Sequence, residues 1–185
     1  MPESFDGDIR YGKVAMSLHW LMVLLLPAQA AIGLAMTRMP IGLDQFLWYG
    51  RHKSFGVILL GLALARWAWR LICIPPALSG QALDIRAAKV VHVLLYATLT
   101  AVPMTGWMMA SASNTPVSIF GLVTLPDLVP PDRELRATLK AAHAVSAALL
   151  AGLVVVHVAG AVRHILRGDG TIRRMLPRKI WSAAS

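Results

Sequence analysis

The sequence is short of charge, of acidic residues and of cysteine. Only 15% of its 185 residues are charged, while 57% are hydrophobic. Soluble domains carry about 25% charged residues. Cys73 is the single cysteine, which excludes an internal disulfide and gives no support to iron–sulfur clusters or covalently attached haem. The composition therefore indicates a protein of the lipid bilayer.

Charge is missing from four long stretches, and these predict membrane-spanning helices. A spanning helix needs about 20 mainly apolar residues, and continuous apolar runs differ from the alternating pattern of a membrane β-barrel. We predict an all-α integral membrane protein, a four-helix up-down-up-down bundle that forms a single transmembrane domain over residues 1–185. The helices are expected at about 14–36, 52–73, 86–110 and 138–164, with outer loops at about 37–50 and 111–133.

The positive charge is distributed unevenly between the two ends of the predicted bundle. Twelve of the eighteen Lys and Arg residues fall on the side that carries both termini. The positive-inside rule therefore predicts that both the N- and the C-terminus lie in the cytoplasm. The net charge of +9 is explained by this topology and by contact with membrane lipid. Nucleic-acid binding is not expected, because the basic residues form no soluble module.

Six histidines lie within or at the ends of the apolar segments, where ionisable residues are rare and usually functional. His143 and His157 are fourteen residues apart, so they lie about 40° apart on one helix face and about 21 Å apart along the axis. The topology places His52 at the depth of His143, and His19 at the depth of His157. We therefore predict two stacked sites, each bridging two helices. The six are His19, His52, His92, His143, His157 and His164.

Two haem b groups are the ligands that suit these sites. Neutral imidazole is a common axial ligand of haem iron, whereas zinc would gather four ligands in one place. His19, His52, His143 and His157 are the predicted iron ligands. For any single histidine, a hydrogen-bonded polar residue or an interfacial anchor is the alternative. His92 lies at the depth of His19 and stays open as a competing ligand, or as a partner of a propionate or a quinone carbonyl.

Basic residues accompany both predicted sites. Arg66 lies fourteen residues after His52, so it shares a face with His52 at the cytoplasmic depth, where it could pair with a propionate of the inner haem. Snorkelling to lipid headgroups is the alternative. On the outer side, Arg51, Lys53 and Lys140 could pair with propionates or attract a small anion. They could equally be ordinary solvated helix ends.

The motifs together resemble one known family. The chain is similar to the bacterial cytochrome b561 family, in particular to its short four-helix di-haem members, which implies a location in the bacterial inner membrane. The resemblance implies two b haems, held by His19/His157 and His52/His143, and electron exchange with ubiquinone. It is carried by Ser17-Leu18-His19-Trp20-Leu21, Arg51-His52-Lys53-Ser54-Phe55-Gly56, Arg66-Trp67-Ala68-Trp69-Arg70, Lys89-Val90-Val91-His92-Val93-Leu94-Leu95-Tyr96, Pro103, Gly106-Trp107, Phe120-Gly121-Leu122, His143, His157 and Met175-Leu176-Pro177-Arg178-Lys179.

The resemblance also implies an activity. The best-known short member of the family acts as a superoxide:ubiquinone oxidoreductase, so the resemblance implies that Arg51, Lys53 and Lys140 attract periplasmic superoxide. The alternative is a cytochrome b subunit that serves a partner dehydrogenase or hydrogenase. A small transporter without haem ranks last, because the predicted spans hold no Asp or Glu. The sequence leaves the quinone site open among His92, His164, Arg163 and Trp20.

Overall fold

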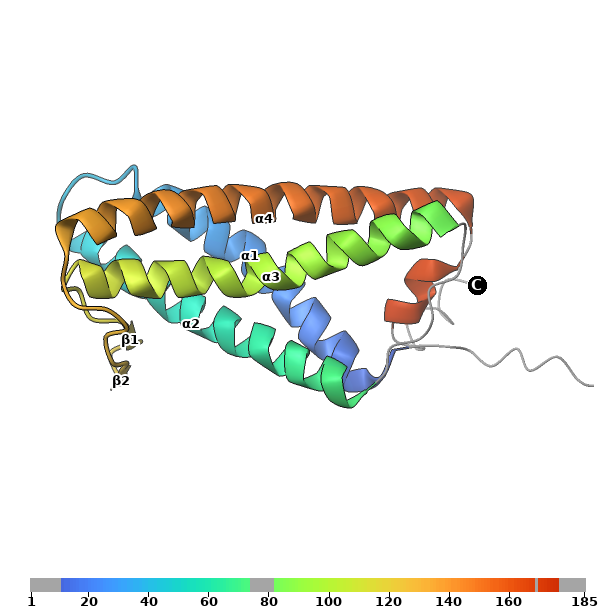
Figure 1. Cartoon of the computed structure of the whole chain (residues 1–185), viewed down its shortest axis with the longest axis horizontal. Coiled ribbons are helices and arrows are strands. Elements are labelled where there is room, and N and C mark those ends of the chain that lie inside the picture. The colour runs from blue at the N-terminus through green and yellow to red at the C-terminus, as the bar shows by residue number, and fades with distance from the viewer. Residues whose placement is uncertain (1–10, 74–81, 169, 177–185) are drawn as a thin grey trace, which may run out of the picture.

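Four long helices follow one another in alternating directions (Figure 1). A computed structural model of the chain describes residues 11–73, 82–168 and 170–176. Each of the four helices is long and apolar enough to cross a membrane, which confirms the predicted all-α membrane fold. They are α1 (Lys13–Met36), α2 (Leu43–Ile72), α3 (Ala82–Ala112) and α4 (Arg133–Arg167), followed by the short 3-10 helix η1 (Thr171–Met175).

Part of the expected organisation lies outside the described residues. This applies to most of the connection between the second and third predicted helices, and to Arg10, Arg178 and Lys179, which contributed to the predicted orientation. Arg163, Arg167, Arg173 and Arg174 at the same end are described. There, Asp84 at the start of α3 accepts 3.0 Å hydrogen bonds from Arg163 and Arg167 of α4, so an ion pair joins the start of α3 to the end of α4.

Helix α2 begins at Leu43, so the prediction of an outer loop up to residue 50 was wrong. Asp44 lies in the first turn of α2, where a negative charge interacts favourably with the helix dipole. The side-chain amide of Gln45 donates to the carbonyl oxygens of Met36 (3.2 Å) and Met39 (3.1 Å), so it satisfies acceptors at and beyond the end of α1. A polar first turn thus extends the helix beyond the stretch that hydropathy identifies.

Helix α4 likewise begins earlier than predicted, at Arg133 rather than near residue 138. Asp132 is its N-cap, and the carboxylate accepts a 2.7 Å hydrogen bond from the backbone N–H of Leu135. An aspartate cap of this kind stabilises a helix by about 1 kcal/mol. The helix therefore begins with charged turns that precede its apolar stretch.

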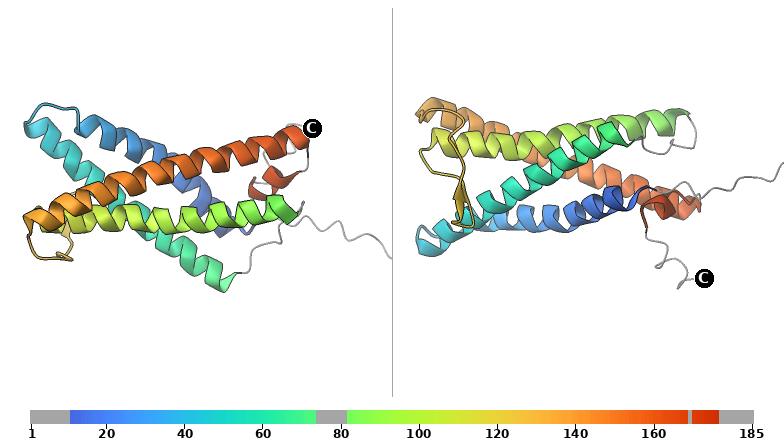
Figure 2. Two further views of the ribbon diagram at one scale, coloured as in Figure 1. Left: turned by 45° about the horizontal axis from the view of Figure 1, so that its top comes forward. Right: turned by 90° about the horizontal axis from the view of Figure 1, so that it is seen from below.

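The helix pairs differ in how extensively they contact each other. Helix α3 lies along α4, α1 packs on α2, and α2 also contacts α3. Figure 2 shows the α1–α2 half crossing the α3–α4 half at an angle. Within the described residues, α1 and α4 are not among the helix pairs in extensive contact. Many large apolar side chains remain on the outside, including Leu24, Leu71 and Leu166, as expected where lipid is the solvent.

The outer loop between α3 and α4 holds a small hairpin that sequence analysis did not predict. Strands β1 (Ser118–Ile119) and β2 (Val123–Thr124) pair antiparallel. The turn between them places Phe120 at φ 50° and Gly121 at φ 77°. A positive φ suits glycine but strains a bulky aromatic residue. The hairpin conformation must therefore be held in place by contacts with the rest of the molecule.

Candidate functional site

The structure brings the four predicted ligands together as two pairs. At the outer level, the ring centroids of His52 and His143 are 6.3 Å apart and their planes lie at 87°. At the inner level, His19 and His157 are 6.2 Å apart at 78°. All four side chains are half-buried. Helix α4 supplies one histidine to each level, and α2 or α1 supplies the other, so both pairs join the two halves of the bundle.

The spacing of both pairs fits two imidazoles on opposite sides of one metal ion. A metal–imidazole bond is about 2.0 Å long and the ring centroid lies about 1.1 Å behind the bonded nitrogen, which gives about 6.2 Å between centroids. Nearly perpendicular planes are compatible with this arrangement, because each ring can turn about its own bond. Within the described residues, no group of three or more His, Cys, Asp or Glu could hold a bare ion. The donor set fits haem better than zinc.

The orientation of His143 is fixed by α3. Its Nδ1 lies 2.9 Å from the carbonyl oxygen of Val102. Because a carbonyl oxygen only accepts, Nδ1 must carry the proton, and the lone pair is then on Nε2. A second hydrogen bond of this kind is how proteins orient imidazole ligands of metals. The Thr105 hydroxyl lies 3.4 Å from the same nitrogen.

The ring of His52 is buried without the same support. Its Nδ1 is one of two buried side-chain atoms without a hydrogen-bond partner in the described part of the chain, and the other is Oε1 of Gln29. The Gln29 amide nitrogen donates to the backbone oxygen of His52 at 2.8 Å. An unpaired buried polar atom costs about 1–3 kcal/mol. Such a cost is expected where a side chain is placed to bind a ligand.

Two glycines lie directly against the outer pair. A Cβ on Gly33 of α1 would be 3.0 Å from Cε1 of His52, and a Cβ on Gly106 of α3 would be 3.1 Å from Cε1 of His143. Both distances are shorter than ordinary contacts between carbon atoms. Glycine at these positions therefore makes room for the two rings. Sequence analysis missed both residues.

A common spacing could have revealed them. On every helix, a residue of the outer level and a residue of the inner level are fourteen positions apart, so they share a face at two depths. The outer set therefore comes from all four helices, and so does the inner set. The pairs are His19 with Gly33, His52 with Arg66, His92 with Gly106, and His143 with His157.

The inner level is more polar than the outer one. The ring of His92 lies 5.4 Å from that of His157, which is shorter than the spacing of two ligands across one iron. The inner set also contains Arg66, whereas the outer set has the two glycines Gly33 and Gly106. His92 is therefore a neighbour of the inner pair and does not lie opposite His157 at ligand spacing.

The predicted outer cations do not gather into one cluster. The Lys53 ammonium donates to the carbonyl oxygen of Pro116 at 2.9 Å, and the Arg51 guanidinium lies over Trp48 at 5.4 Å. Lys140 instead lines a hollow together with Arg133 and Arg136, at positions i, i+3 and i+7 on one face of α4. Sequence analysis did not assign these two arginines to the outer site.

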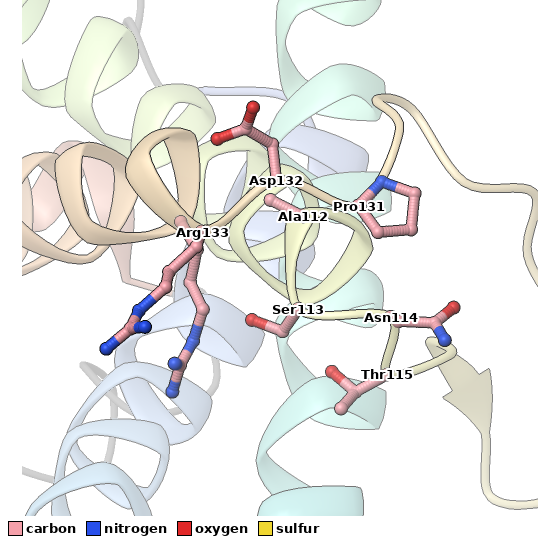
Figure 3. Close-up of a pocket in the computed structure, with 8 residues that line it drawn as sticks. Ala112, Ser113, Asn114, Thr115, Pro131, Asp132 and Arg133 are labelled. Carbon is pink, nitrogen blue, oxygen red and sulfur yellow. The ribbon is translucent and has the colours of Figure 1, made fainter.

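A second hollow adjoins this basic face. It lies where the end of α3 meets the start of α4. Figure 3 shows Asp132 and Arg133 beside Ser113, Asn114 and Thr115. The outer end of the molecule thus offers arginine and lysine side chains next to small polar groups, a surface that attracts anions.

An α-helical membrane bundle with paired, half-buried imidazoles has the architecture of the membrane cytochromes b. The chain belongs to the prokaryotic cytochrome b561 family, whose model matches residues 10–178. It is 30% identical over 174 residues to cytochrome b561 homolog 2 of Escherichia coli (strain K12), covering 90% of this chain and 91% of that protein. It is 26% identical over 174 residues to cytochrome b561 homolog 1 of the same organism, covering 92% and 98%.

The family assignment confirms the resemblance seen in the sequence. It makes the chain a multi-pass protein of the bacterial inner membrane whose activity is electron transfer through haem b. The histidines of the two levels fit that cofactor in donor type and in spacing.

Proposed function

We propose that this protein is an oxidoreductase with two b haems, one held by His52 and His143 and the other by His19 and His157. The observation that carries the proposal is the repeated pair, at 6.3 Å and 6.2 Å between ring centroids. The two ligands on α4 are about 21 Å apart along the helix axis. When bound, haem supplies the one-electron chemistry, while the protein orients it and tunes its electronics.

Superoxide on the periplasmic side is the proposed electron donor. Each superoxide anion gives up one electron and leaves as O₂, so the protein needs only to attract the anion and let it approach. Positive potential at that end comes from the basic face of α4, which is formed by Arg133, Arg136 and Lys140. Arg51, which directly precedes His52, adds to it. Lys53 contributes less, because its ammonium is bonded to a loop carbonyl.

Ubiquinone from the bilayer is the proposed acceptor. Two superoxide anions supply two electrons, and ubiquinone with two protons becomes ubiquinol. Two of the candidate quinone residues are already engaged, since the Trp20 indole N–H donates to the Met175 carbonyl oxygen at 2.8 Å and Arg163 binds Asp84. His92 lies beside the inner pair, so it is the candidate that we place next to the electron exit.

A stopped-flow experiment on the purified protein tests the donor. We expect two haems per chain, with the optical spectrum of bis-histidine b-type haem. Superoxide should reduce them rapidly, and the rate should fall as salt is added. The Arg136→Gln/Lys140→Gln double variant should react roughly tenfold more slowly at low salt. Arg38→Gln, which removes another outer cation, is the matched control.

The same experiment separates the alternatives. Slow, salt-independent reduction that is linear in superoxide would favour a cytochrome b subunit reduced by a partner dehydrogenase or hydrogenase. Fast reduction that the double variant and the control slow equally would show that the basic face of α4 does not guide the anion. A preparation without a b-type spectrum would refute the di-haem proposal itself.

A further inference from the structure

Two arginines of α2 share one tyrosine of α3 at the inner level. The guanidinium carbons of Arg66 and Arg70 lie 5.6 Å and 5.5 Å from the ring centroid of Tyr96. The Nε–H of Arg66 donates to the Tyr96 hydroxyl at 3.0 Å. The ring of Trp67 packs against the same tyrosine at 5.0 Å. Tyr96 is buried, with 9% of its surface exposed, so it is a fixed support for both cations.

The charge of these arginines is not balanced within the described residues. No described carboxylate pairs with Arg66 or Arg70, and the inner ion pairs that are described join Asp84 to Arg163 and Arg167. Two like charges on one ring repel each other, and cations at membrane depth are costly unless they find an anion. The arrangement therefore calls for an anionic ligand beside both guanidinium groups.

The position of the arginines relative to the histidines indicates which anion they could bind. Both guanidinium groups lie against Tyr96, which is one helical turn from His92 on α3, and the ring of His92 lies 5.4 Å from that of His157. Arg66 also occupies the inner position that corresponds to His52 on the same face of α2. An anion held by the arginines would thus lie at the edge of the inner pair. A haem bound by that pair carries two carboxylates on its own edge.

The chemistry of arginine fits carboxylates. Its guanidinium offers parallel N–H groups that match the two oxygens of a carboxylate. Because Arg66 uses its Nε–H on Tyr96, its terminal nitrogens remain for the ligand. The tyrosine hydroxyl therefore fixes the direction in which the guanidinium presents its other donors.

We propose that Tyr96 positions Arg66 and Arg70 as a clamp for the propionate carboxylates of the inner haem. Arg66 and Arg70 touch the carboxylates, and Tyr96 acts through them as a positioning residue. The inference rests on the proposed binding of haem by His19 and His157. Positive charge beside a haem stabilises its reduced form, so the clamp raises the inner midpoint potential and favours electron flow toward the cytoplasmic side.

Tyr96→Phe is the sharpest test, because it keeps the ring under both arginines and removes only the hydroxyl. In a redox titration of the purified di-haem protein, it should lower the inner midpoint potential and leave the outer one unchanged, with haem content intact. Arg66→Gln and Arg70→Gln should each lower it further. The Tyr96→Phe/Arg66→Gln double variant should match Arg66→Gln alone, since the hydroxyl acts through Arg66. Arg86→Gln, an exposed cation of the same cytoplasmic end, is the control.

Two further arms identify the anion. If the carboxylates are the ligand, Arg66→Gln should weaken the binding of haem at the inner site but not the binding of haem dimethyl ester, which offers the guanidinium no carboxylate to hold. If a lipid phosphate is the ligand, the effect of Arg66→Gln should survive esterification and depend on the content of anionic lipid in the nanodisc. That second result would overturn the propionate clamp.

A failure of the proposed function and a failure of the clamp give different results. A wild-type protein without an inner haem would refute the proposed function, and the clamp with it. If the inner midpoint potential shifts no more in Tyr96→Phe than in Arg86→Gln, the clamp alone is overturned. The clamp is also overturned if the shift in the Tyr96→Phe/Arg66→Gln variant equals the sum of the two single shifts.

Discussion

At the scale of the residue, the histidines could be predicted and the glycines could not. A histidine inside a membrane span stands out, and the fourteen-residue spacing of His143 and His157 orders the others by depth. Glycine is frequent in transmembrane helices, so Gly33 and Gly106 carry no mark of their own. Their role depends on which ring lies opposite, and only the packing of α1 on α2 and of α3 on α4 provides that.

Gly106→Val should disturb the outer site selectively. Its side chain would begin 3.1 Å from Cε1 of His143 and 3.2 Å from Nδ1, so the ring would have to move away from the Val102 carbonyl oxygen. We expect haem content to fall from two per chain toward one, with the inner spectrum preserved. A pyridine haemochrome assay measures this. Gly152→Val on α4, where a Cβ meets nothing within 4 Å, is the control, and equal loss in both variants would refute the close-approach argument.

His92 and His19 lead to opposite expectations, although both adjoin His157. The centroid distance from His157 is 6.2 Å for His19 and 5.4 Å for His92, and only the first fits two imidazoles on one iron. His19→Ala should therefore lose one haem, while His92→Ala should keep two. Haem stoichiometry and low-temperature electron paramagnetic resonance distinguish the variants. Loss of a haem in His92→Ala with both retained in His19→Ala would reverse the ligand assignment.

At the scale of the element, hydropathy located the four helices but misplaced the polar ends. The first turn of α2 is made by residues that look like a loop, and Gln45 bonds to α1 only because the chain turns back on itself there. The hairpin between α3 and α4 is similar. Its strands are two residues long, too short for an alternating pattern to predict, and it is held by side chains of α2 that are distant in sequence.

Ser54 is the residue that fastens the hairpin, and Ser54→Ala should loosen it. Ser54 is buried, with 1% of its surface exposed. Its hydroxyl accepts from the Phe120 N–H at 2.9 Å and lies within bonding distance of the carbonyl oxygens of Gly50 and Ser118. Without it, the N–H of a residue at positive φ loses its partner, which should cost about 1–3 kcal/mol. Thermal unfolding in detergent measures the loss.

The control for that prediction is Ser17→Ala on α1, an exposed serine with no bond to the hairpin. It should leave the unfolding midpoint nearly unchanged. Faster proteolysis of the outer loop in Ser54→Ala alone would locate the effect. If both variants unfold at the wild-type temperature, the hairpin does not depend on the Ser54 hydroxyl.

At the scale of the whole molecule, the order of the helices follows from the sequence, whereas the angle between the two halves does not. Uncharged runs count the spans, and short connections make neighbours antiparallel. The crossing of α1–α2 over α3–α4 depends on side-chain packing along whole helices (Figure 2). The orientation in the membrane is a further matter, because it depends on how Lys and Arg are distributed between the loops, and it remains a prediction.

Reporter fusions test that orientation directly. Alkaline phosphatase folds to its active form only outside the cytoplasm, so a fusion after Pro126, in the loop that follows the hairpin, should be active. A fusion after Ser185 should be inactive, while green fluorescent protein at the same point should fluoresce. These results follow because twelve of the eighteen basic residues accompany the termini and hold that side in the cytoplasm. The opposite pattern would place His19 and His157 on the periplasmic side, and superoxide would then meet Arg66 and Arg70 before the basic face of α4.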